Sequence, residues 1–277
     1  RWQALNDLAL PNLVDAARKA RAGEPVETNP VLADTLIAIA GDEALEPAFR
    51  AQALALPSES DIARELGSNN DPDAIRAGRE AVLAFIANRN PAVFAALFEN
   101  HGTTGAFTPD AASAGQRALR NAALAYLAVS DGGPTRAAAA FKAADNMTDL
   151  SAALTVLAHR FPDASETAEA LEASRARFAD NALVIDKWFS IQSTIPGAGA
   201  LERVKALGGG IAVQCRMAYQ GEYFMDRYGK EAAEHTPPVR RMLEMGIPVG
   251  AGTDATRVAS YNPWVSLYWL TTGKTVG

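Results

Sequence analysis

Short breaker segments divide the first 207 residues of this chain into stretches of helical length. The breakers combine Gly, Pro, Asp, Asn and Ser, and they occur as GEP at 23, GDE at 41, PSES at 57, GSNNDPD at 67, TPD at 108, DGGPT at 131, FPDAS at 161 and IPGAG at 195. The stretches between them, about 10 to 25 residues each, have the usual length of helices. This punctuation predicts a succession of helices joined by short loops.

Apolar residues recur at helical spacing within these stretches. In NMTDLSAALTVLAHRF (146–161), the apolar side chains three or four positions apart are Met147, Leu150, Leu154 and Leu157. The expected N-caps are Thr108 (before Pro109), Thr148 and Ser165. With short loops and no strict repeat period, residues 1–207 are predicted to be mainly α, as an irregular helical superhelix or stack.

Composition narrows the class of protein. The chain has 277 residues and is 48% apolar, enough for a buried core. Its 26 Lys and Arg against 32 Asp and Glu give a net charge of −6, and the absence of a basic cluster in the sequence disfavours nucleic acid as a partner. A single cysteine, Cys215, excludes an internal disulfide and fits a cytoplasmic protein. The longest apolar runs, such as 121–129, are too short to cross a membrane. Because the chain starts at Arg1 inside a helical pattern and stops at GKTVG, we expect a fragment of a longer protein.

The pattern changes at about residue 208. GGGIAVQ (208–214) is a glycine turn followed by an apolar run, and TPPVRRMLEMGIPVGAGTDA (236–255) indicates a helix, a glycine stop and a buried strand. Helix followed by strand is typical of α/β folds. The sequence therefore predicts two domains, a helical domain at 1–207 and a short α/β segment at 208–277.

The glycines of IPVGAGTDAT (247–256) allow two interpretations. Gly250, Gly252 and Ala255 fit the G-x-G-x-x-G/A pattern of dinucleotide-binding turns, whereas Asp254 stands where a barrel strand presents a carboxylate. A dinucleotide site requires a long helix directly after the glycines, but Asn262-Pro263 follows within a dozen residues. The strand-end carboxylate is therefore favoured.

The helical part resembles the C-terminal helical domain of bacterial aminopeptidase N, a family of zinc aminopeptidases of the gluzincin type. The segments that carry the resemblance are ALPSES (55–60), RALRNAALAYLA (117–128), ADNMTDLSAAL (144–154) and NALVIDKWFSIQST (181–194). In that family the peptide substrate and the zinc are bound by domains upstream of this one, through an H-E-x-x-H helix, a distant Glu and a G-x-M-E-N strand. None of these motifs occurs here. The resemblance implies a non-catalytic scaffold that helps to enclose the active-site chamber, with zinc bound only in full-length relatives.

The tail, 209–277, resembles the C-terminal part of metal-dependent amidohydrolases of the imidazolonepropionase and exoenzyme-regulatory type. The segments that carry this are GGIAVQCRMAYQGEYF (209–224), TPPVRRMLEMGIPVGAGTDATR (236–257) and YNPWVSLYWL (261–270). The resemblance implies the end of a (β/α)₈ barrel, with Asp254 as the metal ligand that accepts a proton from the attacking water. A barrel needs at least about 200 residues and a metal site three or more ligands, so in this chain a turn-capping role for Asp254 is favoured.

The other candidate side chains have structural interpretations. The three histidines are far apart in the sequence and lie near expected helix ends, and Cys215 has no histidine partner in a recognisable motif; the histidines are His101, His159 and His235. Glu59, Asp61 and Glu65 suit the start of a helix.

Three functions follow from the sequence. The first is the non-catalytic helical scaffold of an aminopeptidase N-like metallopeptidase, joined to an incomplete amidohydrolase-like tail. The second is a fragment of a metal-dependent amidohydrolase that acts on C–N bonds. The third is a helical module that binds proteins or peptides on its concave face.

The domain division predicts where protease acts first. Because few contacts are expected to cross the boundary, limited proteolysis should cut first between about residues 205 and 235 and leave a folded helical fragment. Mass spectrometry of the earliest fragments measures this. A tail that resists protease as long as the helical part would contradict the division.

Overall fold

The chain forms two compact units. The computed structural model describes residues 2–68, 70–102, 106–130, 132–254 and 260–276. The helical unit comprises Arg1–Glu65 and Pro72–Ile195, and the tail unit comprises Leu66–Asp71 and Pro196–Gly277. Each unit is described by itself.

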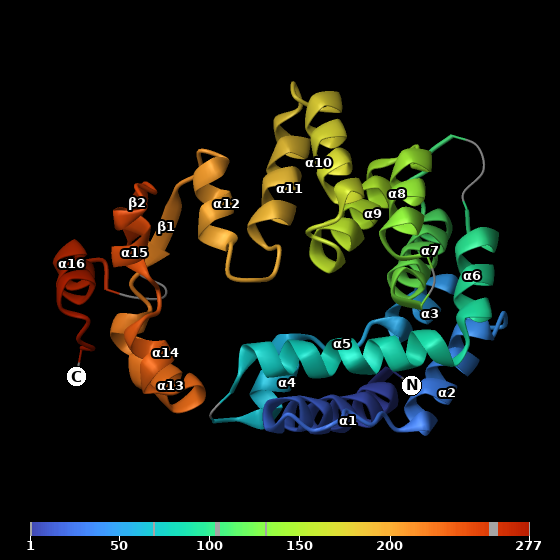
Figure 1. Cartoon of the computed structure of the whole chain (residues 1–277), viewed down its shortest axis with the longest axis horizontal. Coiled ribbons are helices and arrows are strands. Elements are labelled where there is room, and N and C mark those ends of the chain that lie inside the picture. Colours follow the sequence, from blue (N-terminus) through green and yellow to red (C-terminus); the bar gives the residue numbers. More distant parts are fainter. Residues whose placement is uncertain (1, 69, 103–105, 131, 255–259, 277) are drawn as a thin grey trace. The chain divides into compact units, whose positions relative to one another are not determined.

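The helical unit contains no strand among its described residues, as the sequence predicts. Its helices are α1 (Trp2–Ala22), α2 (Pro30–Gly41), α3 (Pro47–Leu54), α4 (Glu59–Leu66), α5 (Pro72–Arg89), α6 (Pro91–Asn100), α7 (Ala111–Ser130), α8 (Gly133–Ala143), α9 (Met147–Arg160), α10 (Ser165–Arg177) and α11 (Ala182–Ser193). Figure 1 shows them as successive rods joined by short loops.

The helices begin at caps other than those expected. Asn146, rather than Thr148, caps α9 by accepting a hydrogen bond from the Asp149 N–H at 3.0 Å. At the start of α7 the Asp110 carboxylate accepts from the Ser113 N–H at 2.9 Å, so the expectation for Thr108 was wrong. Ser165 is already inside α10, which has no side-chain cap. Asn and Asp fill these positions because their short side chains reach the free N–H groups of the first turn.

α1 and α5 lie side by side in close contact (Figure 1). A Cβ atom at Gly78 of α5 would lie only 2.6 Å from the backbone carbon of Ala16 and the nitrogen of Ala17 on α1. The absence of a side chain at Gly78 thus lets the two backbones approach. Around this point the apolar side chains of both helices, including Leu13 and Val82, are fully buried.

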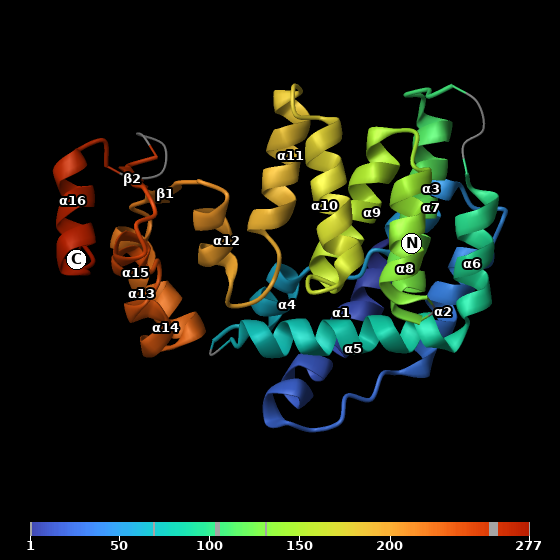
Figure 2. The same cartoon turned by 45° about the horizontal axis from the view of Figure 1, so that its top comes forward.

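The later helices stack one after another. α8, α9, α10 and α11 contact their neighbours in turn, as Figure 2 shows. α7 joins this stack to the earlier helices because it contacts α3, α5 and α6 as well as α8 and α9. The ring of Tyr126 on α7 stacks on Phe94 of α6 with centroids 4.5 Å apart, and its hydroxyl donates to the Leu54 carbonyl at 2.7 Å.

The tail unit contains strands as well as helices. They are α12 (Ala200–Ala206), β1 (Ile211–Gln214), α13 (Met217–Tyr228), α14 (Lys230–Glu234), α15 (Val239–Glu244), β2 (Val249–Gly252) and α16 (Pro263–Thr272). The two strands are parallel, with Ile211 opposite Val249 and Gln214 opposite Gly252. The expected glycine stop is present, since Gly246 has a φ of 74° just after α15.

The fold confirms a mainly helical chain and corrects the finer prediction for the tail. Two parallel strands of four residues each are all that the described part of the tail contains, so the predicted end of a (β/α)₈ barrel has no support in the fold. The expected buried strand is also only partly buried. Ile247 before β2 is buried, but Gly250 and Ala251 are exposed because β2 has a strand partner on one side only.

None of the described helices is by itself both long and apolar enough to span a membrane. α5 and α6 together meet the requirements of length and composition, but the chain bends by 82° between them.

The close approach of α1 and α5 predicts the effect of adding one methyl group. Gly78→Ala should lower the free energy of unfolding by about 2 kcal/mol, because the new Cβ meets backbone that cannot move aside. Denaturant titration followed by circular dichroism measures this. Gly41→Ala is the matched control: a Cβ there meets nothing within 4 Å, so the change should be a stabilisation of at most about 1 kcal/mol. Equal effects of the two substitutions would contradict the packing argument.

Candidate functional site

Asp254 lies where the sequence places it, beyond the carboxyl end of a strand. It follows β2 by two residues, as Arg216 follows β1, and the register of the strands brings the two side chains to the same edge. Arg216 Nε lies 3.8 Å from Asp254 Oδ2, and both side chains are about half exposed. The partner of Asp254 in this structure is therefore a cation of the protein itself.

The backbone of Asp254 has an uncommon conformation. Its φ of 56° is in the left-handed region, which Asp adopts more readily than most residues with a side chain. The N–H groups that Asp254 would cap belong to residues 255–259, so the expected capping role lies outside the described residues. Its role as metal ligand and proton acceptor stays a prediction.

Each histidine contacts a group near a helix end. His235 Nδ1 donates to the Glu231 carbonyl at 2.8 Å, and His159 Nε2 donates to the Ile191 carbonyl at 3.0 Å. The Nδ1 atom of His101 donates to the side-chain oxygen of Gln116. Among the described residues, no group of three or more His, Cys, Asp or Glu side chains is arranged to hold a metal ion.

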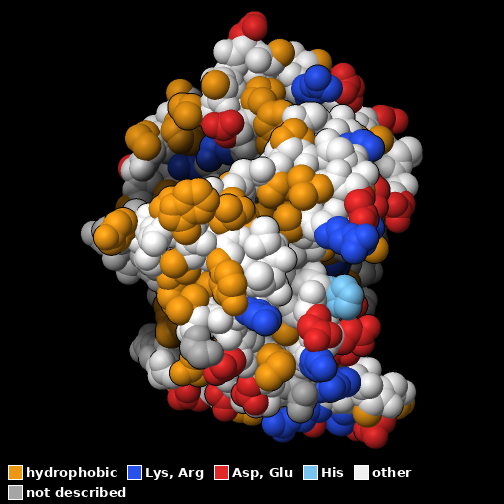
Figure 3. Space-filling model, turned by 90° about the vertical axis from the view of Figure 1, so that its left-hand side faces the viewer, with side chains coloured by type: hydrophobic (Ala, Val, Ile, Leu, Met, Phe, Trp, Pro, Cys, Tyr) orange, Lys and Arg blue, Asp and Glu red, His pale blue; other side chains and the backbone are white. Residues whose placement is uncertain are grey.

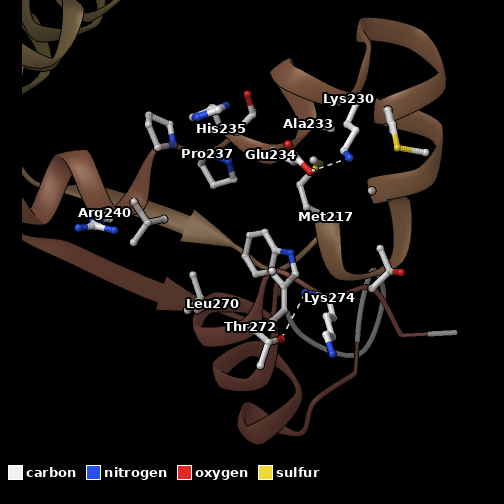
Figure 4. Close-up of a pocket in the computed structure, with 18 of the residues that line it drawn as sticks. Met217, Lys230, Ala233, Glu234, His235, Pro237, Arg240, Leu270, Thr272 and Lys274 are labelled. Atoms are coloured by element: carbon white, nitrogen blue, oxygen red, sulfur yellow. Dashed lines mark hydrogen bonds and ion pairs between the residues drawn. The ribbon is translucent and has the colours of Figure 1, made fainter.

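A hollow of about 1390 Å³ in the tail unit is lined by residues of α13 to α16 (Figure 4). Four of its charged side chains form two exposed pairs one helical turn apart. Lys230 Nζ lies 3.7 Å from Glu234, and Arg240 Nε donates to Glu244 at 2.8 Å, which raises the pKa of Arg240. Pairs of this kind are screened by water and contribute little to stability.

A smaller hollow of about 550 Å³ lies in the helical unit, lined by parts of α2, α3, α6 and α7. Buried Arg50 is at its wall and donates to the carbonyl of Ala40 through two nitrogens, Nε at 2.9 Å and Nη2. The guanidinium thus satisfies a carbonyl at the C-terminal end of α2. Exposed Glu43 also lines this hollow, so its lining carries both signs of charge.

Glu59 and Asp61 lie in the first turn of α4, as expected, whereas Glu65 lies in its last turn and the expectation for it was wrong. Asp61 accepts from the N–H and the hydroxyl of Ser58 at 3.1 and 2.6 Å, and Ser58 Oγ accepts from the Asp61 N–H at 3.2 Å. This reciprocal arrangement is a capping box. The hydrogen bonds from Ser58 lower the pKa of Asp61.

A buried polar network, which the sequence did not indicate, connects two of the segments that carry the aminopeptidase resemblance. Asp149 at the start of α9 is buried and accepts from Asn121 Nδ2 at 2.8 Å and from Asn146 Nδ2 at 3.0 Å. Arg120 Nη1 lies 3.4 Å from the same carboxylate. Its guanidinium also covers the ring of Phe98, 4.2 Å from the centroid. RALRNAALAYLA and ADNMTDLSAAL therefore meet around one carboxylate.

The other two segments also have structural roles. Arg79 Nε on α5 donates to the Pro57 carbonyl of ALPSES at 3.0 Å. In NALVIDKWFSIQST, Asn181 caps α11 and Trp188 Nε1 donates to the Leu171 carbonyl at 2.8 Å. All four segments thus fix how the helices pack.

Comparison with known proteins identifies the family to which these segments belong. Residues 1–212 match a family model described as "Domain of unknown function (DUF3458_C) ARM repeats". The chain belongs to this family. Aminopeptidase N of Caulobacter vibrioides is 37% identical over 210 residues, and that of Escherichia coli is 32% identical over 213. Each alignment covers 75% of this chain and 24% of the relative.

A solved structure shows the same fold. It is described as the crystal structure of Legionella pneumophila aminopeptidase A in complex with aspartic acid, and it matches with a TM-score of 0.63 at 24% identity. The match covers 75% of this chain and 25% of that one. This chain thus spans about a quarter of the length of the relatives it matches, as the C-terminal helical domain of aminopeptidase N homologues.

Removal of Asp149 and removal of Asp254 are predicted to lower stability by very different amounts. Asp149→Ala should lower the free energy of unfolding by about 3 kcal/mol, because it leaves buried donors and Arg120 without their acceptor. Asp254→Ala removes an exposed ion pair and places alanine at a positive φ, so the loss should be about 1 kcal/mol. Denaturant titration measures both. A large loss with Asp254→Ala would show that this residue stabilises the tail in a way the ion pair does not explain.

Proposed function

We propose that the helical part of this chain is a non-catalytic scaffold of an aminopeptidase N-like metallopeptidase. In this role the stack of helices helps to enclose the chamber in which peptides are cleaved. The zinc ion is held by residues outside this chain, because an H-E-x-x-H helix needs two histidines four positions apart and the sequence has only His101, His159 and His235.

The observation that carries this proposal is the structural role of the residues that resemble the family. Asp149 on α9 contacts Asn121 and Arg120 on α7. Asn146 caps α9, and Trp188 anchors α11 by its indole N–H. A domain of catalytic function would instead bring its characteristic residues to a pocket. The aminopeptidase N relatives, at 37% and 32% identity, supply the activity of the protein to which such a scaffold would belong.

For the tail we retain the amidohydrolase hypothesis as a separate proposal, supported only by the position of Asp254 beyond the end of β2. It would act on C–N bonds once further ligands are supplied from outside this chain. We also propose a cytoplasmic location, on the basis of the single cysteine.

A chimera tests the scaffold proposal. In the Caulobacter vibrioides enzyme, the segment that aligns with this chain would be replaced by residues 1–212. Because the replacement makes the same inter-helix contacts, zinc-dependent hydrolysis of an alanyl amide should stay within about tenfold of the parent rate, about 1.4 kcal/mol in barrier. The same chimera with Asp149→Ala should be less stable and less active. A chimera that folds as stably as the parent and is inactive would contradict the proposal.

The isolated chain provides the complementary measurement. It should not hydrolyse the same alanyl amide with or without added zinc, since a catalytic zinc site needs three protein ligands and the sequence lacks the motif that supplies them. Activity that chelation abolishes and zinc restores would show a complete site within these 277 residues.

A further inference from the structure

Arg50 on α3 is a buried cation without an acidic partner. Its side chain is 3% exposed, and within the part of the chain that the structure describes it forms no ion pair with Asp or Glu. Exposed cations of this chain lie beside acidic side chains, as Figure 3 shows on one face of the molecule and as Lys230 does with Glu234. Because a guanidinium keeps its proton, Arg50 carries a full positive charge into the interior.

The hydrogen bonds of Arg50 occupy two of its three nitrogens. Nε, at 2.9 Å, and Nη2 donate to the carbonyl of Ala40. Nη1 has no acceptor among the described residues, and it is not one of the buried side-chain nitrogens that are sealed from solvent. The C-terminal end of α2 offers roughly half a negative charge. Capping of α2 therefore explains only part of this buried cation, and positive potential remains at Nη1.

The surface that Arg50 retains lines a hollow. The hollow has a volume of about 550 Å³, which is within the range of small-molecule sites. Since Arg50 is almost fully buried elsewhere, the hollow is where its remaining contact with solvent lies. A positive charge at the wall of a small hollow attracts anions into it, because little water is present to screen the charge.

The rest of the lining combines one polar pair with an apolar wall. His101 Nδ1 donates to the side-chain oxygen of half-buried Gln116, so the amide nitrogen of Gln116 remains as a donor without an acceptor among the described residues. Val93 and Leu97 of α6 provide the apolar wall. Glu43 also lines the hollow, but it is exposed, so water screens its charge.

We propose that this hollow binds a small organic carboxylate. One carboxylate oxygen accepts from Arg50 Nη1, the amide of Gln116 is the second donor in the lining, and the short aliphatic part of the ligand lies against Val93 and Leu97. A charge-assisted hydrogen bond of this kind is stronger than a neutral one, and it compensates the charge that the Ala40 carbonyl leaves over. The inference goes beyond the scaffold role and does not depend on it.

Titration of the full chain with sodium propionate, followed by saturation-transfer NMR, tests the proposal. Over a range of about 0.1 to 20 mM propionate, binding should saturate with a Kd of about 1 mM, because so few ligand atoms cannot give high affinity. Propionamide has the same shape without the charge. It should bind at least about tenfold more weakly, because it lacks the charge-assisted hydrogen bond.

Gln116→Glu is the decisive variant. It keeps the oxygen that accepts from His101 and places a carboxylate inside the hollow, so propionate should bind at least about tenfold more weakly. Gln52→Glu is the matched control, since Gln52 is exposed on the same helix as Arg50 and is not among the residues that line the hollow; affinity should stay within about twofold. Arg50 itself is left in place, because Arg50→Ala would also unpair the Ala40 carbonyl.

Three outcomes would overturn the proposal. The first is propionate binding that does not saturate by about 20 mM, well above the expected Kd. The second is propionamide that binds as tightly as propionate, which shows that the charge of Arg50 is not used. The third is a Gln116→Glu chain that is folded by circular dichroism and binds propionate with unchanged affinity, which places the ligand elsewhere.

Discussion

The buried carboxylate of Asp149 holds the start of α9 against α7 in the helical unit. A charge out of water is tolerated only when it is paired and hydrogen-bonded, and here Arg120, Asn121 and Asn146 provide this together. The network fixes the start of α9 against α7, the helix that also contacts α3, α5 and α6. One carboxylate therefore joins the earlier helices to the later stack. Burying this charge without its partners would cost free energy, so arrangements of the helices that separate the partners are disfavoured.

This dependence explains why a domain without a catalytic motif has a recognisable sequence. The segments that resemble aminopeptidase N are where helices touch through polar groups, and such contacts tolerate few residue types, whereas alanine and leucine on a packed face can be exchanged with little loss. The residues that carry the family match over 1–212 therefore act in the packing of the helices. This makes a scaffold the simplest role for a chain that spans about a quarter of its relatives.

The tail is held together by other means. Its core is a small apolar cluster around Trp269 and a parallel strand pair with one open edge on each strand. Two strands alone are only marginally stable, because too little of each face is covered. The exposed apolar side chains Trp264, Leu267 and Tyr268 of α16 reflect the same shortage of covering structure within the tail unit.

The sequence by itself determined the succession of helices and the helix start at Glu59 and Asp61. These features depend on residues within one or two helical turns of each other, where periodicity and capping act. It did not determine that Asn146 caps α9, because several polar residues compete at a helix start and packing selects among them. Only the tertiary structure decided that Asp254 faces Arg216 and that Asp149 meets Arg120, since these pairs are 38 and 29 positions apart in the chain. Contacts at such separations are fixed by how whole helices and strands pack, which no local pattern encodes.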